Sequence, residues 1–155
     1  MGSIGTVKRN ATAGGIFTMN RSQYGIDIME AYNPERGPEP ESWLELDEQE
    51  RILLIETWHR VARIKLPNLT AHAALHVIVE NQIALDLEPV VRAMDRLRKQ
   101  GLTRHDAIHA IGSVVAGHLF DILQANQNDD AAASQARYYA AVERLTAVSW
   151  RSGEQ

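Results

Sequence analysis

Cysteine is absent from the 155 residues of this chain, and its absence excludes several kinds of chemistry. Without a thiol the chain can form no disulfide, no thiolate zinc site and no iron–sulfur cluster, and it has no cysteine nucleophile. Any metal ion that the chain binds must therefore be held by histidine nitrogen and by oxygen donors.

An excess of positive charge is also lacking. The formal net charge is −4 and the sequence pI is about 5.8. A nucleic-acid-binding domain usually carries a basic stripe that neutralises phosphates. We therefore expect no nucleic-acid partner.

Long apolar runs and several familiar catalytic motifs are missing as well. No uninterrupted apolar run approaches the roughly 20 residues that cross a bilayer, and no basic segment followed by a hydrophobic one marks the N-terminus. We expect no membrane partner and a cytoplasmic location. The chain also lacks GxSxG, GxxxxGK and GxGxxG, the usual signatures of serine hydrolases, P-loop proteins and Rossmann domains.

The composition that remains is that of one globular domain preceded by an arm. Hydrophobic residues make up 45% of the chain and charged residues 23%, which is enough to bury one core. The first 40 residues are rich in Gly, Ser, Thr, Asn and Pro and show no helical or strand period. We predict an extended or partly disordered arm over residues 1–40 and a single helical domain over 41–150. Apolar side chains in the arm, such as Tyr32, could dock on this domain or on a second copy, which would form a homo-oligomer.

Helical signals recur along the rest of the chain. Asp47 followed by Glu50 is a capping-box pattern, Thr70 suits an N-cap, and Gly101 stands where a helix-ending glycine belongs. No convincing period-two strand interrupts them. We therefore predict an all-α bundle of four to five helices. The expected helices cover about residues 47–64, 70–85, 88–100, 103–124 and 130–150.

Two HxxxH pairs, His72/His76 and His105/His109, are the strongest chemical signal. Residues four apart lie on one face of a helix, so each pair can direct two imidazoles at one point. Burying imidazoles without partners costs a few kcal/mol per unsatisfied group, and a transition metal such as iron, zinc or manganese would satisfy them together. We predict one shared site for one or two ions. Each pair falls on an apolar stripe, and the second stripe continues through Gly112, Ala116, Leu119 and Leu123.

Two carboxylates accompany these pairs as candidate catalytic groups. Glu80 follows His76 by four residues, so it can either bind the ion or orient a ligand. Asp106 is adjacent to His105, although its place three residues after Thr103 also suits helix capping.

A further histidine lies on the first predicted helix. Glu56 and His59 form the ExxH step of carboxylate-bridged di-iron bundles, so His59 joins the candidate ligands, with a structural core histidine as the alternative. His118 falls about 180° around the helix from His109, and we interpret it as structural. Trp58 is expected to serve core or lid packing.

The chain also resembles a known family over about residues 30–125. The residues that carry the pattern are Leu66-Pro67-Asn68-Leu69, His72, His76, Gln82, Arg96-Leu97, Gly101 and the stretch from Arg104 to Ala110. This pattern resembles a family of short bacterial proteins described only as a domain of unknown function. The resemblance implies a signature of two HxxxH elements, a glutamine after the first and an acidic residue within the second. The family often has an acidic residue directly before that glutamine, where this chain has Asn81, and Glu80 stands one position earlier.

Three classes of function fit these residues. The first is a metal-dependent enzyme acting on a small molecule, either a non-haem iron oxidoreductase or a zinc or manganese hydrolase. The second is an HD-like phosphohydrolase built on the doublet His105-Asp106 with Asp121, although Asp121 lies about 120° around the helix from His109. The third is a non-catalytic metal- or haem-binding or regulatory interaction module.

Overall fold

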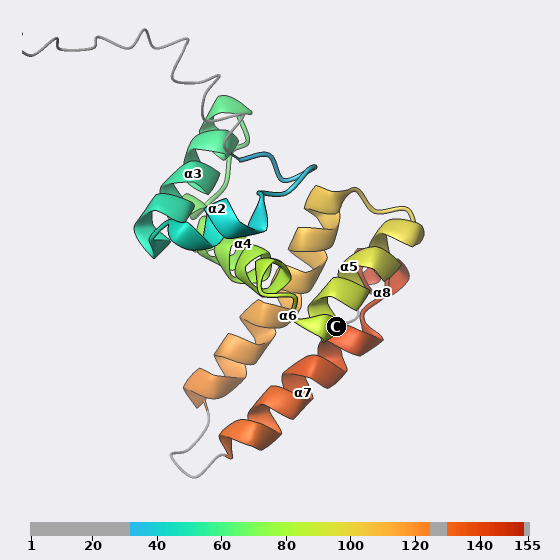
Figure 1. The fold of residues 1–155 in the computed structure, drawn as a ribbon. Coiled ribbons are helices and arrows are strands. Elements are labelled where there is room, and N and C mark those ends of the chain that lie inside the picture. Colours follow the sequence, from blue (N-terminus) through green and yellow to red (C-terminus); the bar gives the residue numbers. More distant parts are fainter. Residues whose placement is uncertain (1–31, 125–129, 154–155) are drawn as a thin grey trace, which may run out of the picture.

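The chain folds into helices joined by short loops in this computed structural model, which describes residues 32–124 and 130–153 (Figure 1). The described residues form seven helices and no strand, so the predicted all-α class is confirmed. Residues 1–31, which carry most of the predicted arm and its proposed role in a homo-oligomer, lie outside the described residues. The helices are α2 (Pro40–Glu45), α3 (Glu48–Val61), α4 (Leu69–Ala84), α5 (Glu88–Lys99), α6 (Arg104–Gln124), α7 (Ala131–Arg144) and α8 (Ala147–Ser152).

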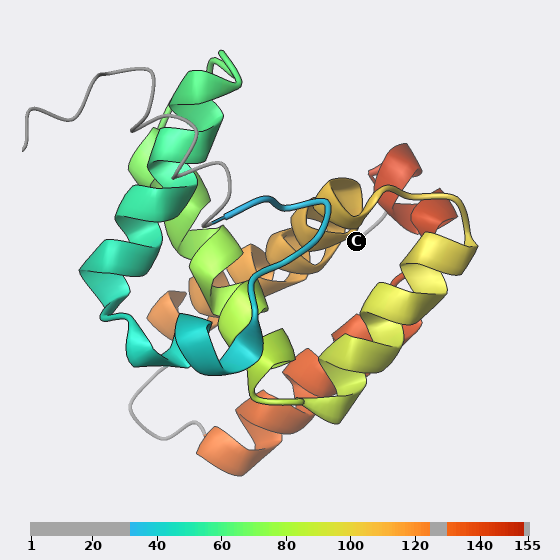
Figure 2. The same ribbon diagram turned by 45° about the horizontal axis from the view of Figure 1, so that its top comes forward.

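Helix α4 lies between two hydrophobic cores. Figures 1 and 2 show α2 and α3 on one side of it and α5, α6 and α7 on the other. Its sequence, LTAHAALHVIVENQIA, is apolar around most of its circumference, as expected of a helix that is covered on several sides. The smaller core contains Tyr32, Trp43, Ile55, Ala73 and Val77. The larger core is centred on α5 and α6 and includes Val79, Val90, Leu97, Ile108, Ile111 and Val142.

The predicted signals at the ends of α3 and α5 are confirmed. Asp47 and Glu50 form the reciprocal capping box, with the Glu50 amide donating to Asp47 Oδ1 at 2.8 Å and the Asp47 amide donating to Glu50 Oε2 at 2.9 Å. Gly101 follows α5 with φ of +91°, the left-handed conformation that a helix-ending glycine supplies.

The N-cap predicted for α4 is wrong. Asn68 is the N-cap, and its Oδ1 accepts a hydrogen bond from the Ala71 amide at 3.0 Å. An asparagine side chain caps at least as well as a threonine, so the helix begins at Leu69 and includes Thr70. The Thr70 hydroxyl instead donates to Glu56 Oε1 on α3 at 2.6 Å.

The single fifth helix predicted to reach Trp150 is also wrong, because α7 ends at Arg144 and a separate helix, α8, begins at Ala147. Leu145 and Thr146 are extended, and Thr146 forms a new capping box with Ser149 at the start of α8. Threonine competes for local backbone hydrogen bonds, which favours a cap over a helix interior.

Helix α6 is packed in its first half and exposed in its second. Ala107, Ile108 and Ile111 are buried, whereas Leu119 and Leu123 are 42% and 81% exposed. The predicted core stripe is therefore wrong beyond about Val115, because α6 extends past α4 at that end (Figure 1). Among the described helices, α6 alone is long and apolar enough to cross a membrane by length and composition, although polar residues interrupt its apolar run.

A turn before α2 ties the end of the predicted arm to the bundle. Tyr32 is fully buried in the smaller core, and the Arg104 guanidinium donates to the Pro34 carbonyl at 2.8 Å. Gly37 has φ of +77°, and a Cβ at this position would lie 2.6 Å from Arg104 Nη2. Only glycine combines this conformation with so close an approach.

Candidate metal centre

Five imidazoles from three helices meet between α3, α4 and α6. One nitrogen from each ring can be chosen so that all five lie within 4.8 Å of one another. The centroids of neighbouring rings are 4.4 to 5.4 Å apart. The structure thus brings together the four paired histidines and the histidine of the ExxH step. These five residues, called the histidine cluster below, are His59 on α3, His72 and His76 on α4, and His105 and His109 on α6.

His59 presents a free lone pair to the cluster. Its Nδ1 lies 2.8 Å from the carbonyl oxygen of Ile55, one turn earlier on α3. Because a carbonyl can only accept, Nδ1 carries the hydrogen and Nε2 keeps its lone pair. That Nε2 lies 3.1 Å from Nε2 of His72.

His76 is oriented in the same way by a tyrosine and a carboxylate. The Tyr32 hydroxyl donates to Glu80 Oε1 at 3.2 Å and lies 3.1 Å from His76 Nδ1. Because the hydroxyl hydrogen is used on the carboxylate, Nδ1 of His76 must donate to the hydroxyl oxygen. The Nε2 of His76 therefore offers its lone pair, and it lies 3.0 Å from Nε2 of His109.

The two short nitrogen–nitrogen distances fit neighbouring ligands on one ion. Two donors about 2.1 Å from an ion are about 3.0 Å apart when they subtend a right angle and about 3.4 Å apart in a tetrahedron. The contacts of 3.1 Å and 3.0 Å match the right angle. Nε2 of His105 is buried and has no hydrogen-bond partner in the described parts of the chain, and a shared ion would satisfy it.

Burial keeps the cluster neutral. Desolvation, reinforced by repulsion among the rings, lowers the pKa of His72, His105 and His109 from about 6.5 to about 4. The pKa of His76 falls well below its ordinary range for the same reasons, and burial also lowers the pKa of His59. Neutral imidazoles at pH 7 are the form that binds a metal.

Glu80 lies beside the cluster and is already neutralised. Arg104 holds it with two hydrogen bonds, from Nη1 to Oε1 at 2.8 Å and from Nη2 to Oε2 at 2.6 Å. Glu80 is not among the residues that the structure brings together as a ligand group. Its contact with the cluster runs through the Tyr32 hydroxyl to His76.

The other two predicted carboxylates also stand outside the ligand group. Glu56 accepts from Thr70 at 2.6 Å and from Arg60 at 2.7 Å. Asp106 is half-buried in the first turn of α6, where its amide donates to the Thr103 hydroxyl at 3.0 Å. Its negative charge opposes the lowering of the pKa of His105 and His109.

Tyr32, Arg104 and Trp58 are neighbours of the cluster that sequence reasoning did not assign to it. Tyr32 comes from a segment without periodicity, so no sequence signal pointed to it. Arg104 did carry a signal, because a cation in the first turn of a helix is unfavourable unless a carboxylate holds it. Trp58 packs edge to face against His59 and His105, with ring centroids 5.0 and 5.2 Å apart.

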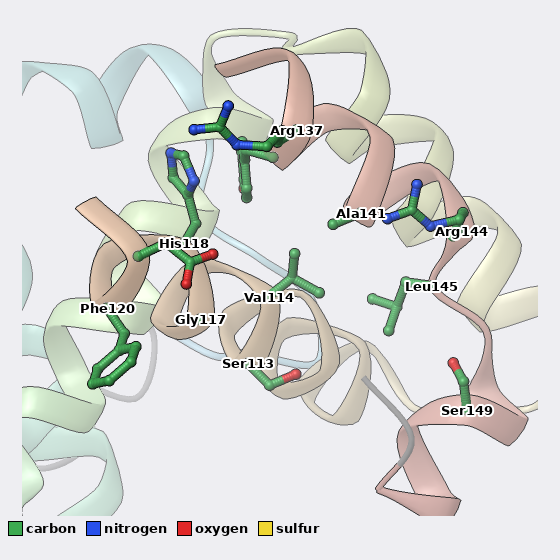
Figure 3. Close-up of a pocket in the computed structure, with 12 residues that line it drawn as sticks. Ser113, Val114, Gly117, His118, Phe120, Arg137, Ala141, Arg144, Leu145 and Ser149 are labelled. Atoms are coloured by element: carbon green, nitrogen blue, oxygen red, sulfur yellow. The ribbon is translucent and has the colours of Figure 1, made fainter. Parts of the chain in front are cut away.

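His118 and Asp121 lie elsewhere, in a cavity of about 550 Å³ between α6 and the C-terminal helices (Figure 3). The His118 ring stacks on Tyr138, with centroids 5.0 Å apart, as expected of a structural histidine. The hydroxyl of Tyr138 donates to Gln82 Oε1 at 2.8 Å. The glutamine of the family-like signature therefore joins α4 to α7 and does not contact the cluster.

Comparisons of the chain with protein-family models, with curated proteins and with solved structures gave no match.

Proposed function

We propose that this chain binds one transition-metal ion through the five imidazoles of the histidine cluster and acts as a non-haem iron oxidoreductase on a small molecule. The observation that carries the proposal is the convergence of five neutral nitrogen donors within 4.8 Å. Four of these nitrogens contact one another in pairs, and Nε2 of His105 is buried without a partner among the described residues, so a shared ion would satisfy a donor that the packing leaves unpaired.

The compactness of the cluster favours one ion. Two ions in a shared site lie about 3.5 to 4 Å apart, and their outermost ligands would then be about 6 Å apart or more. The five nitrogens span at most 4.8 Å. A single ion at about 2.1 Å from each donor places opposite ligands about 4.2 Å apart, which small shifts of the side chains would achieve.

The donor set favours iron over zinc and manganese. Zinc sites are usually four-coordinate, and manganese prefers carboxylate and water oxygens. Five imidazole donors, two pairs of which have the spacing of a right angle at the ion, suit an octahedral ion, and iron(II) accepts imidazole readily. Copper(II) would bind more tightly to any such nitrogen set, so metal availability contributes to the choice.

Five protein ligands leave one position of an octahedron open. His72, His105 and His109 are only half-buried, so a small molecule can approach the ion from their side. In this proposal Glu80 positions His76 through Tyr32, and Asp106, half-buried beside His105 in the first turn of α6, is the candidate for proton transfer.

The HD-like alternative has less support, because such a site needs carboxylate ligands. Asp106 is outside the ligand group, and Asp121 lines the cavity beside His118. A non-catalytic metal module would use the same five ligands, and it differs from the proposal in lacking turnover at the open position.

Metal content is the direct test. Protein made without a histidine tag, purified anaerobically and loaded with iron(II), should hold about one ion per chain, and removal of the ion should lower Tm. An ion at 100 times its Kd adds about 2.7 kcal/mol to the free energy of unfolding. His118→Ala should bind metal like the parent, whereas alanine at any cluster histidine should not. A parent that retains less than about a tenth of an equivalent of iron, zinc, manganese or copper would refute the proposal.

A further inference from the structure

An ion in the histidine cluster would carry charge that none of its ligands among the described residues cancels. All five ligands are neutral imidazoles, whereas nearby Glu80 is engaged by Arg104, and Glu56 by Arg60 and Thr70. Among the described residues Asp106 also acts on the cluster through its charge, but it is not a ligand. A divalent cation among neutral donors in a low-dielectric site is strongly stabilised by a nearby anion.

Trp58 has a hydrogen-bond donor without an acceptor beside this centre. Its Nε1 atom is buried, and no partner for it exists among the described residues. The other indole in this part of the fold is satisfied, because Trp43 Nε1 donates to Asn81 Oδ1 at 2.9 Å. A buried N–H without a partner costs about 1 to 3 kcal/mol. An acceptor that binds beside the Trp58 indole would remove this cost.

The position of Trp58 connects these two observations. Its ring packs against both His59 and His105, which come from different helices and are both members of the cluster. A ligand of two or three atoms on the ion would therefore lie within reach of this indole. A monovalent anion supplies both the missing charge and the missing acceptor.

We propose that the open position of the occupied centre takes a small monovalent anion and that the Trp58 indole N–H donates a hydrogen bond to it. The inference rests on the proposed metal site and names the class of molecule that this site accepts. Trp58 acts here as a specificity-determining residue for an exogenous ligand, and the five imidazoles alone hold the ion.

Azide is a suitable probe, and cobalt(II) makes its binding visible by absorption. The full-length, cobalt-loaded protein should bind one azide per ion. Trp58→Phe keeps most of the ring but removes the N–H, and it should bind cobalt with unchanged stoichiometry. Its Kd for azide should rise about 10- to 100-fold, the effect of losing one hydrogen bond to a charged acceptor. Trp43→Phe is the matched control, because its N–H already has an acceptor, and its Kd for azide should equal that of the parent.

The outcomes separate this inference from the metal proposal. A parent that binds no metal refutes the proposed function. A parent that binds cobalt but shows no azide complex up to about 100 mM azide refutes only the anion site. Equal azide affinity in the parent and in Trp58→Phe refutes the role of Trp58.

A second measurement applies even if Trp58→Phe does not fold. The zinc-loaded parent, labelled with ¹⁵N-tryptophan, has three indole resonances, since the chain has three tryptophans. Phenylalanine variants of Trp43 and Trp150 assign the third resonance to Trp58. Addition of azide should shift the Trp58 N–H proton downfield, as expected for a new hydrogen bond. An unchanged Trp58 resonance at saturating azide overturns the inference.

Discussion

Replacing Arg104 with methionine would leave the Glu80 carboxylate buried without its counter-ion. The Glu80 side chain is fully buried and that of Arg104 is 9% exposed, and two hydrogen bonds of 2.6 and 2.8 Å join them. Removal of one partner of such a pair costs about 3 to 5 kcal/mol. For a chain of this size that loss corresponds to a fall in Tm of about 10 °C. Methionine preserves much of the side-chain volume, so the loss reports on charge and hydrogen bonding.

Urea and thermal unfolding of the metal-free protein measure this effect, and two controls define it. Arg92→Met removes an exposed ion pair with Glu88 and Glu143 and should cost far less stability than Arg104→Met, because solvent screens the exposed charges. The double variant Glu80→Leu with Arg104→Met removes both charges and should recover most of the stability lost in Arg104→Met. If Arg104→Met is no less stable than Arg92→Met, Glu80 does not depend on Arg104 and the reasoning is refuted.

Three further expectations follow from the site and its surroundings. Glu80→Gln should weaken metal binding, measured by calorimetric titration, by no more than about 10- to 100-fold, the usual effect of a residue that orients a ligand. A loss of metal affinity as large as that of a cluster-histidine variant would show that Glu80 is itself a ligand. In thermal melts at fixed ionic strength, the Tm of the metal-free protein should fall as pH is lowered from about 6.5 to 5, because histidines whose folded pKa is about 4 bind protons first in the unfolded state. A Tm that stays constant or rises over this range would contradict a buried, neutral cluster. Gly37→Ala should destabilise the folded state by about 2 kcal/mol in urea unfolding. Gly101→Ala should destabilise it less, because Gly101 also has a positive φ but has open space around it. Equal losses of stability in the two variants would show that the contact with Arg104 is unimportant.

Local patterns predicted the helices well, because their signals act over three or four residues. The capping box at Asp47 and the glycine at 101 determined ends that tertiary packing did not change. The prediction was wrong where two local signals competed, as at Asn68 and Thr70, and where a cap such as Thr146 interrupted an otherwise helical run.

The cluster could be anticipated only in part from the sequence. The i and i+4 spacing placed His72 beside His76 and His105 beside His109, but it could not show how three helices would orient toward one another. The addition of His59 depends on the packing of α3 against α4. Tyr32 lies 44 residues from His76 in sequence, and no periodic pattern connects residues that far apart.

The order of the five histidines along the chain has a consequence for the assembly of the centre. Helices α3 and α4 are adjacent in sequence and pack together, and they carry His59, His72 and His76. The other two ligands, His105 and His109, lie on α6, which follows α5 in the sequence. Contacts between neighbouring segments cost less chain entropy and form earlier than distant ones. We therefore expect a nascent trio of imidazoles before the centre is complete, and three histidines are already the ligand set of a zinc enzyme. If the proposed centre binds a metal, such a trio could bind an ion before α6 completes the site, so the order of folding would influence which ion the centre holds.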